Sequence, residues 1–364
     1  MEIFIDDFGT FATAVGIVAA ETGNKVTFRV KTYDYPHLEL YLSLLRVGKN
    51  HKGKRENDLH LPGVELPANI QFTDNYDPAL LADVIFIAVP SGYLEENVMA
   101  LLPYLKKNSR CTVVLLTKGI DAKSMLPWAL KLKKDLALAA GHHNFAVLSG
   151  YTPAKDFAVS KMSRKFYAAS VASSNLNAIK KVRSVFRNSQ LGIIGTTDIG
   201  GVGLGGALKN AYAPGYGIFI GRAIEIEKTD ENAAKELRQL ARKYLALAHN
   251  EMKLFLDYFG ANPKTWSSPA VKGDFYLTCQ GEIGWESRNV AFGRLLATYP
   301  VKEKILEYVS GHTVEGYDAM RALWDIGQNQ NFHLPLLYSL YRIVSGGHHQ
   351  LLTDIVKKMT KSSG

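Results

Sequence analysis

The chain has 364 residues with 47% hydrophobic and 21% charged residues, so it can bury substantial cores, and its length suggests two domains. Its net charge of +9 favours anionic partners such as phosphorylated metabolites or nucleotides, but the densest basic runs, at residues 51–55 and 161–165, lack the interleaved aromatic residues of a nucleic-acid surface and are interpreted as solvated loops. The cysteines, Cys111 and Cys279, are far apart and give no disulfide framework or metal-ligand spacing, and no apolar run is long enough to span a bilayer.

The first residues predict a nucleotide-binding unit. Residues 2–6 are expected to form a short buried strand, residues 10–21 a small-residue helix packed on it, and residues 25–30 a second strand. This order within about thirty residues is typical of the start of a doubly wound dinucleotide-binding fold. The same N-terminal residues contain no basic segment or long apolar core, so we expect no secretory signal, and the few cysteines fit a reducing, cytoplasmic compartment.

The turn between the first strand and the first helix departs from the usual glycine fingerprint. It reads DFGTFA at residues 7–12, where the fingerprint has glycine at the first, third and sixth places. Only the middle glycine is present, and alanine is permitted at the last place. Because Asp7 would oppose a pyrophosphate electrostatically, we expect weakened cofactor binding, unless its carboxylate turns toward the start of the helix, where acidic groups are favourable.

The rest of the chain changes character after Thr197. Before it, apolar segments predict strands that alternate with helices and form a mainly parallel sheet covered on both faces, at residues 84–89, 112–116, 145–148, 166–172 and 191–194. After it, long helical segments predict a helical domain, at residues 232–258, 301–310, 314–326 and 335–345. We therefore expect a Rossmann-type domain at residues 1–197 and a helical substrate-binding and catalytic domain at residues 198–364.

Small-residue turns follow three of the predicted strands, at residues 89–91, 117–120 and 148–150. Ligands of open α/β sheets bind outside the carboxyl ends of the strands, so these turns should line one crevice, with Lys118 projecting into it. A second lysine, Lys209, follows the segment GLGGA at residues 203–207. Adjacent glycines disfavour a helix and suggest that backbone from a ligand or another element comes close; the alternative is an ordinary turn before a helix, with Lys209 solvated.

Several motifs resemble the NAD(P)-dependent glycerol-3-phosphate dehydrogenase family. They occur in the family's order and cover nearly the whole chain: LPGVELPANI at 61–70, ADVIFIAVPS at 82–91, TKGI at 117–120, AVLSG at 146–150, GVGLGGALKNAYA at 201–213, GDFYLTC at 273–279, SRN at 287–289 and VEGY at 314–317. The combination of GGALKN with GDFYLTC and SRN is the specific part, because Rossmann proteins in general do not share it.

The resemblance implies a fold and an activity. The fold is a Rossmann-type domain followed by an all-α domain of the 6-phosphogluconate dehydrogenase-like type. The activity is the interconversion of dihydroxyacetone phosphate and sn-glycerol 3-phosphate with NAD or NADP, which supplies the backbone of glycerophospholipids. A homodimer is expected, without nucleic acid, membrane insertion or a metal.

The resemblance also assigns catalytic residues. Lys209 matches the lysine that protonates the ketone oxygen during reduction, and Lys118 matches a second lysine that faces the substrate. Asp274 and Thr278 match a pair that supports Lys209; they are four residues apart, so a helix places both on one face. Taken singly, Asp274 could equally be a helix N-cap or part of an ordinary ion pair.

Binding residues follow in the same way. Asn210, Arg288 and Asn289 match the groups that hold the substrate phosphate, for which arginine is suited, although Arg288 alone could be a surface ion pair. The second strand ends at Arg29-Val30-Lys31 with no carboxylate before Asp34, so NADPH should be accepted, unless Arg29 and Lys31 simply point to solvent. The residues expected at the cofactor are Gly9, Thr10, Phe11, Ala12, Lys31, Pro90, Lys118, Ala154, Arg288 and Glu315.

Some segments depart from the family pattern. The chain has Tyr151-Thr152-Pro153 where the family has proline before an aromatic residue, and four acidic residues at 225–231 replace a glycine-rich stretch. These departures leave two alternatives open: a related dehydrogenase for another small phosphorylated or acidic alcohol, or a catalytically weak nucleotide-binding relative. The joint presence of Lys118, Lys209 and Asp274 with the phosphate-binding motif argues against the second alternative.

Overall fold

The computed structural model describes residues 1–30, 38–298, 302–311 and 314–361. The chain divides into two compact units: unit 1 comprises Met1–Lys118 and Trp128–Val202, and unit 2 comprises Gly119–Pro127 and Gly203–Gly364. The division comes later than the expected position after residue 197. The short segment Gly119–Pro127 also belongs to unit 2, which the sequence did not indicate.

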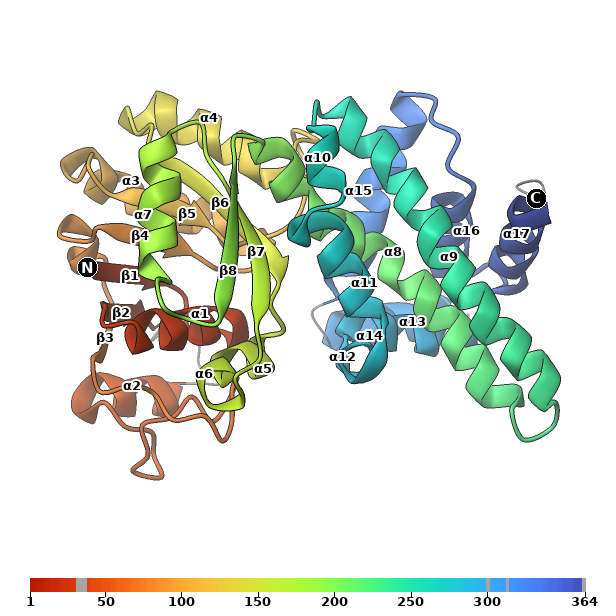
Figure 1. The fold of residues 1–364 in the computed structure, drawn as a ribbon, viewed down its shortest axis with the longest axis horizontal. Coiled ribbons are helices and arrows are strands. Elements are labelled where there is room, and N and C mark those ends of the chain that lie inside the picture. Colours follow the sequence, from red (N-terminus) through yellow and green to blue (C-terminus); the bar gives the residue numbers. More distant parts are fainter. Residues whose placement is uncertain (31–37, 299–301, 312–313, 362–364) are drawn as a thin grey trace. The chain divides into compact units, whose positions relative to one another are not determined.

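Unit 1 is built on an eight-stranded sheet (Figure 1). The strand order is β3-β2-β1-β4-β5-β6-β7-β8, and every neighbouring pair is parallel except β6 and β7. The prediction of a mainly parallel sheet is therefore confirmed. The strands are β1 (Glu2–Asp6), β2 (Lys25–Arg29), β3 (Ile70–Thr73), β4 (Val84–Ile87), β5 (Thr112–Leu115), β6 (Phe145–Tyr151), β7 (Tyr167–Ala172) and β8 (Leu191–Thr196).

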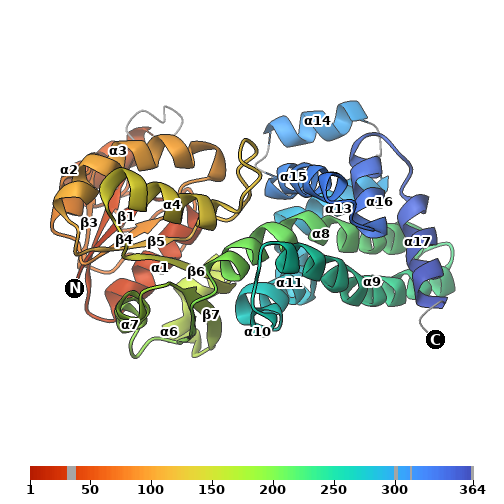
Figure 2. The same ribbon diagram turned by 90° about the horizontal axis from the view of Figure 1, so that it is seen from above.

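Helices cover both faces of this sheet, as the apolar central strands require (Figure 2). Helices α3 (Leu94–Lys107) and α4 (Trp128–Ala140) lie on one face, and α1 (Thr10–Glu21) and α7 (Leu176–Val185) lie on the other. Residues 84–87 of β4 are all buried between the two layers. The remaining helical segments are α2 (Leu38–Val47), η2 (Asp77–Leu80), η3 (Ser91–Tyr93), α5 (Ala154–Ala158) and α6 (Ser160–Ser163).

The strand order reverses between β1 and β4. From β1 the chain continues outward to β2 and β3, and then returns to form β4 on the other side of β1. In doubly wound folds, dinucleotides bind outside the carboxyl ends of the strands at such a reversal. The turn at residues 7–9 and the segment at residues 88–90 follow β1 and β4 directly, so the fold places both at the expected binding edge.

The turn expected at residues 148–150 is wrong. Strand β6 continues to Tyr151, and Ser149 and Gly150 pair with Ser170 and Ala169 of β7. Gly150 permits this pairing, because a Cβ atom there would lie 2.9 Å from Cβ of Ala169 and would also collide with its backbone. Pairing with the antiparallel strand β7 extends β6 beyond its run of apolar residues.

The basic run at residues 51–55 is only partly a solvated loop. Residues 51–54 are exposed. Arg55, however, donates hydrogen bonds to the backbone oxygens of Gly48, Pro67 and Ile70 at 3.2, 3.0 and 2.8 Å. The guanidinium therefore joins the end of α2 to the start of β3, and the interpretation as a solvated residue is wrong for Arg55.

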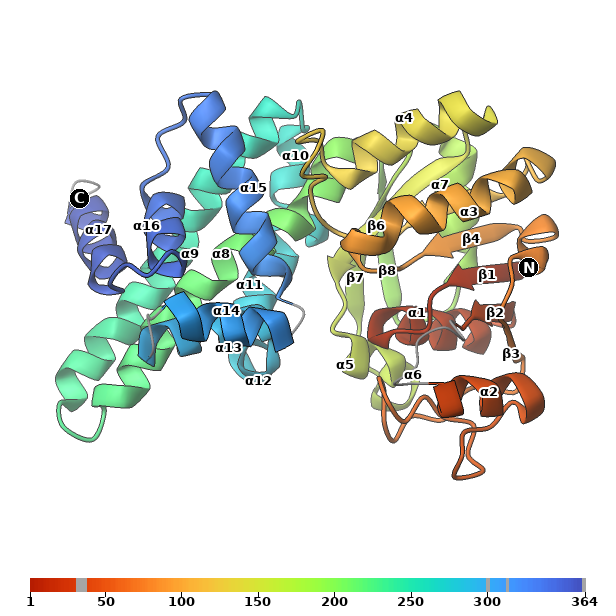
Figure 3. The same ribbon diagram turned by 180° about the vertical axis from the view of Figure 1, so that it is seen from behind.

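Unit 2 is helical, as expected, and its core surrounds one long helix, α8 (Figure 3). Helix α8 (Ile199–Ile226) is apolar around most of its circumference, which is typical of a helix buried on all sides. It runs beside α9 (Glu231–Tyr258), where the hydroxyl of Tyr244 donates to the backbone oxygen of Tyr212 at 2.7 Å. The other segments are α10 (Pro263–Trp266), η4 (Pro269–Gly273), α11 (Asp274–Cys279), α12 (Gly281–Glu286), α13 (Arg288–Thr298), α14 (Lys302–Gly311), α15 (Glu315–Asn329), α16 (Pro335–Val344) and α17 (Gln350–Lys361).

The glycine-rich segment at residues 203–207 lies inside α8, so the alternative of an ordinary turn at this position is wrong. The expected helices at 232–258, 314–326 and 335–345 correspond to α9, α15 and α16. Residue 301, where a further helix was expected to begin, lies outside the described residues, and α14 begins at Lys302. Within the described part of the chain, every helix is too short or too polar to cross a lipid bilayer.

Candidate functional site

Lys209 lies in unit 2 with both residues that were expected to support it. Its Nζ atom is 2.8 Å from Oδ1 of Asp274 and donates to Oγ1 of Thr278 at 3.0 Å. The lysine side chain is 13% exposed and the Asp274 side chain 5%. The alternative in which Lys209 is simply solvated is therefore wrong, and the expected one-face pairing of Asp274 and Thr278 is present on α11.

A glycine on α8 allows α11 to lie this close. A Cβ atom at Gly205 would overlap with the backbone oxygen of Ala270, which belongs to η4, the turn that leads directly into α11. The close backbone approach expected from the glycine pair is confirmed at Gly205. The approaching backbone comes from η4.

The ammonium of Lys209 lies between a carboxylate and a hydroxyl group. A carboxylate at ion-pair distance stabilises the charged form of a lysine, and partial burial strengthens that interaction. The nearby thiol of Cys279 is fully buried, and this burial raises its pKa well above the ordinary value, so it stays neutral and is a poor nucleophile. The arrangement therefore suits acid–base chemistry at Lys209 and does not suit a cysteine nucleophile.

The residue after Lys209 begins a second set of hydrogen bonds. Asn210 donates from Nδ2 to Oε2 of Glu315 at 2.6 Å, and its Oδ1 accepts from Nδ2 of Asn289 at 2.9 Å. Oδ1 of Asn289 in turn accepts the backbone N–H of Gly316 at 3.0 Å. These bonds join α8, α13 and the first turn of α15, and they fix how both amides are oriented.

Each of these two amides has a second N–H group in addition to the one used in this network, since a carboxamide carries two donors. Asn210 and Asn289 are buried, whereas Arg288, the first residue of α13, is exposed. Among the described residues, no acidic side chain forms an ion pair with Arg288, so the alternative of a surface ion pair is not present. Two amide donors and an adjacent guanidinium are the groups that a phosphate needs.

Glu315 was expected on the cofactor side, and the structure shows what it contacts in unit 2. Its carboxylate accepts from Asn210, and it is the first residue of α15. Sequence reasoning did not connect it with Asn210, because the two residues are 105 positions apart. A glutamate at a helix N-terminus is favourable in itself, so its position alone gave no sign of this contact.

In unit 1 the fingerprint turn has a specific internal arrangement. The carboxylate oxygen Oδ2 of Asp7 accepts the backbone N–H of Gly9 at 3.3 Å, so Asp7 faces the start of α1, which is the alternative that the sequence left open. Asn57 fixes the same turn: its Nδ2 donates to the backbone oxygen of Phe8 and to Oγ1 of Thr13, each at 2.8 Å. Sequence reasoning missed Asn57, which lies in the long connection between α2 and β3, four residues before the motif at residues 61–70.

The other residues expected at the cofactor in unit 1 lie at the carboxyl ends of strands. Thr10, Phe11 and Ala12 form the first turn of α1, whose leading N–H groups have no partner within the helix and attract anions. Pro90 follows β4, Lys118 follows β5, and Ala154 begins α5, which packs against α1. This edge fits a nicotinamide dinucleotide, apart from the Asp7 carboxylate.

Arg29 is not available to a cofactor phosphate in the way its sequence position suggested. It is 4% exposed, its Nε is 2.6 Å from Oδ1 of Asp6, and its Nη2 donates to Oδ1 of Asn97 at 2.6 Å. Its guanidinium also lies over the ring of Tyr76, 4.3 Å from the centroid. The alternative in which Arg29 points to solvent is wrong as well, and Lys31 lies outside the described residues.

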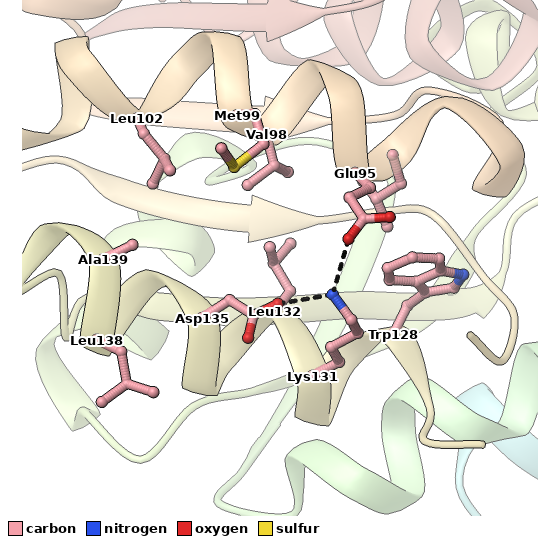
Figure 4. Close-up of a pocket in the computed structure, with 11 residues that line it drawn as sticks. Glu95, Val98, Met99, Leu102, Trp128, Lys131, Leu132, Asp135, Leu138 and Ala139 are labelled. Atoms are coloured by element: carbon pink, nitrogen blue, oxygen red, sulfur yellow. Dashed lines mark hydrogen bonds and ion pairs between the residues drawn. The ribbon is translucent and has the colours of Figure 1, made fainter. Parts of the chain in front are cut away.

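A separate cavity of about 340 Å³ lies between α3 and α4 in unit 1 (Figure 4). Its walls are mostly apolar, and at one end the ammonium of Lys131 is 3.7 Å from Glu95 and 2.8 Å from Asp135. None of the residues expected at the cofactor or the substrate lines it. The cavity is therefore distinct from the candidate site.

Two family models match the chain. The model for the N-terminus of NAD-dependent glycerol-3-phosphate dehydrogenase matches residues 7–178, and the model for its C-terminus matches residues 198–351. Among similar proteins, the glycerol-3-phosphate dehydrogenase (NAD(P)+) of Teredinibacter turnerae is 28% identical over 341 residues, which cover 93% of this chain and 89% of the relative. That of Bacillus subtilis is 27% identical over 340 residues, or 93% and 88% of the two chains.

Solved structures show the same fold. Glycerol-3-phosphate dehydrogenase from Coxiella burnetii has a TM-score of 0.77 at 24% identity and covers 98% of each chain. The yeast enzyme has a TM-score of 0.71 at 19% identity, covering 98% of this chain and 99% of its own. A D-mandelate dehydrogenase complex with NADH has a TM-score of 0.57 at 14% identity.

Proposed function

The chain belongs to the NAD-dependent glycerol-3-phosphate dehydrogenase family, and on this premise we propose that it transfers hydride between NAD(P)H and dihydroxyacetone phosphate to give sn-glycerol 3-phosphate. It is an NAD(P)-dependent oxidoreductase. The observation that carries the choice of reaction is the partly buried lysine with its carboxylate and hydroxyl partners, adjacent in sequence to an amide pair that suits a phosphate.

Lys209 is the proton donor of this proposal. A nicotinamide cofactor would supply hydride to the carbonyl carbon, and negative charge would then develop on the ketone oxygen. The ammonium of Lys209 gives its proton to that oxygen, and general acid assistance of this kind is worth ~100- to 10,000-fold. Asp274 and Thr278 hold the ammonium in position, at 2.8 and 3.0 Å from Nζ. Lys118 is the second lysine that faces the substrate.

The phosphate of the substrate is held by Asn210, Asn289 and Arg288. Their contribution is electrostatic and geometric: the two amides are pre-oriented by Glu315 and Gly316, so little freedom is lost when they bind an anion. Arg288 adds charge and two parallel donors. A substrate without a phosphate would leave these groups without a partner, which favours a phosphorylated alcohol or ketone over an unphosphorylated one.

The cofactor is NAD or NADP. We assign its binding to the first turn of α1 and to the residues that follow β4, β5 and β6. Unit 1 is accordingly the nucleotide-binding domain, and unit 2 the substrate-binding and catalytic domain. Since Arg29 is held by Asp6 and Asn97, acceptance of NADPH depends on Lys31.

The cellular role follows from the product. sn-Glycerol 3-phosphate is the backbone of glycerophospholipids, so the enzyme would supply phospholipid synthesis. Two buried free cysteines without a disulfide fit a reducing compartment, and we place the protein in the cytoplasm. We also propose a homodimer, as expected from the resemblance.

One assay tests the proposal. NADH and NADPH are each mixed with dihydroxyacetone phosphate and the protein, and loss of nicotinamide absorbance is followed. Dihydroxyacetone, which lacks the phosphate, serves as the matched control substrate. We expect turnover with the phosphorylated ketone only. Equal rates with both ketones would show that Arg288 does not bind a substrate phosphate. No turnover with either ketone would reject the proposed reaction in favour of a related dehydrogenase or a catalytically weak relative.

A further inference from the structure

We infer that Gly205 is a positioning residue for proton transfer: the absence of its side chain sets the distance between Lys209 and the two groups that hold it. The inference rests on the proposed function, because it concerns the proton that Lys209 delivers. Gly205 contacts neither substrate nor cofactor in this account and acts through η4 and α11.

The spacing of the residues along the two elements connects Gly205 to Lys209. The two residues are four positions apart in α8 and therefore lie one turn apart on the same face. On the opposite side, Ala270 in η4 is followed four positions later by Asp274, the first residue of α11. The contact between Gly205 and Ala270 thus lies one turn before the contact between Lys209 and Asp274 and determines how closely α11 approaches α8.

The contact between Gly205 and η4 leaves no room for a side chain at residue 205. A methyl group at Gly205 would overlap with the carbonyl oxygen of Ala270 and would lie 2.9 Å from Cγ2 of Val271, whereas ordinary contact begins at 3.4 Å. Ala270 and Val271 are fully buried, and a backbone oxygen cannot rotate out of the way as a side chain can. The whole of η4 would therefore retreat by about 1 Å.

Such a retreat would break the site selectively. Lys209 Nζ lies 2.8 Å from Asp274 and 3.0 Å from Thr278, and hydrogen bonds of this type weaken steeply once about 1 Å is added. Turn η4 is also a π-type turn, in which the N–H of Gly273 bonds back to Ser268 at 3.2 Å; such turns are rare and often lie at functional sites. The phosphate-binding amides are on α8 and α13, and their hydrogen bonds are to each other and to α15, not to η4.

A second glycine on α8 gives a matched control. A Cβ atom at Gly217 would overlap with the backbone oxygen of Val290 and would lie 2.9 Å from the Cα of Gly293. Val290 directly follows Asn289, so we expect the same small substitution here to displace α13 and the phosphate-binding amide; none of the atoms nearest to this Cβ belongs to η4. Gly205→Ala and Gly217→Ala therefore make the same chemical change on one helix, against two different parts of the proposed site.

The experiment compares both variants with wild type in steady-state reduction of dihydroxyacetone phosphate, with circular dichroism as a check of folding. We expect Gly205→Ala to lower kcat by about 100-fold, because a 1 Å misplacement of a catalytic group costs about that much, with KM little changed. We expect Gly217→Ala to act mainly on KM. A crystal structure of Gly205→Ala should show Lys209 Nζ beyond hydrogen-bond distance of Asp274.

Failures of the inference and of the proposed function can be told apart. Absence of turnover in the wild type rejects the proposed function, but the 209–274 distance in the variant crystal still decides the positioning role. An intact distance, or wild-type kcat in folded Gly205→Ala, overturns the inference. If Gly205→Ala does not fold, Val271→Ala tests the same contact from η4, because it removes the methyl group that faces Gly205. This variant should lower kcat with KM little changed, and an unchanged kcat overturns the inference.

Discussion

At the scale of single residues, Lys209→Ala is expected to abolish most turnover. It removes the proton donor and leaves the first turn of α1 untouched, so kcat should fall ~100-fold or more while NADH binding, measured by fluorescence titration, stays the same. Lys235→Ala is the control, because this lysine is 61% exposed in an ion pair with Glu231. Retention of more than about a tenth of the wild-type kcat would contradict the role of Lys209.

Arg288→Ala is expected to separate substrate binding from cofactor binding. Arg288 is exposed and directly precedes Asn289 in the chain, so its loss should raise KM for dihydroxyacetone phosphate steeply and leave KM for NADH almost unchanged. Arg238→Ala, which removes a surface arginine paired with Glu227, is the matched control. Equal increases in both KM values would contradict the assignment of Arg288 to the substrate phosphate.

Asp7→Gly is expected to tighten cofactor binding. The Asp7 carboxylate accepts the N–H of Gly9, a group that a pyrophosphate would use, and its charge opposes the nucleotide by ~1 kcal/mol even in a watery environment. Its removal should strengthen NAD(P)H binding about five- to tenfold per kcal/mol, with kcat little changed. Asp74→Gly removes one exposed negative charge from the same unit as a control. Unchanged or weaker binding in Asp7→Gly would show that the carboxylate does not lower the affinity for NAD(P)H.

Only the site residues that lie in recognisable motifs could be predicted from the sequence. The pairing of Asp274 and Thr278 with Lys209 was implied by the family resemblance, and their four-residue spacing predicted one shared helix face; both are present in the structure. The bond between Asn210 and Glu315 could not be predicted, because it depends on where α15 begins relative to α8. The prediction for Arg29 was wrong for a related reason: its partner Asn97 comes from α3, and no local sequence pattern indicates this contact.

At the scale of elements, strands with continuous apolar runs were found to within one or two residues, because β1, β4 and β5 are buried in the middle of a sheet. Strand β3 was missed. It has four residues, of which only Ile70 is buried, and it forms because β2 offers a parallel edge. Helix α17 was also missed, although its own sequence is strongly amphipathic; its apolar side packs on α9 and α16.

Helix α16 gives an element-scale prediction about pH. Its first N–H groups, from Leu336 and Leu337, donate to the two carboxylate oxygens of Glu251 at 2.7 and 3.1 Å, and Tyr212 donates its hydroxyl to the same group at 3.0 Å. Burial raises the pKa of Glu251 from 4.5 to about 7. The folded protein therefore keeps this proton at pH values where the unfolded chain has released it.

The sign of the pH effect follows from linkage. The contribution of Glu251 protonation to folding is fully present below pH 4.5 and is lost as the pH rises to about 7. The free energy of unfolding of wild type, measured against Glu251→Gln by urea titration, should thus decrease over this interval by roughly 3 kcal/mol at most. Glu236→Gln, on the exposed side of α9, is the control. A wild-type advantage that grows with pH would contradict the burial effect.

At the scale of the whole molecule, the division into two units explains which predictions were incomplete. The change from strands to helices after Thr197 indicated two domains, and each unit has its own apolar core. The segment Gly119–Pro127 nevertheless belongs to unit 2, although it lies between two elements of unit 1. Its Ile120 packs against the core of unit 2, a contact far away in sequence that no periodicity could reveal.

The two units should also respond to different ligands, which hydrogen exchange can measure. NADH alone should slow amide exchange most at residues 7–12 of unit 1, because the cofactor stabilises the closed form of the turn that it binds. Dihydroxyacetone phosphate alone should slow exchange at the starts of α13 and α15 in unit 2, where Asn289 bonds to the N–H of Gly316. Glycerol, which lacks the phosphate, is the control and should have no effect there. Protection of unit 1 alone by dihydroxyacetone phosphate would mean that the substrate phosphate is not held by Asn210, Asn289 and Arg288.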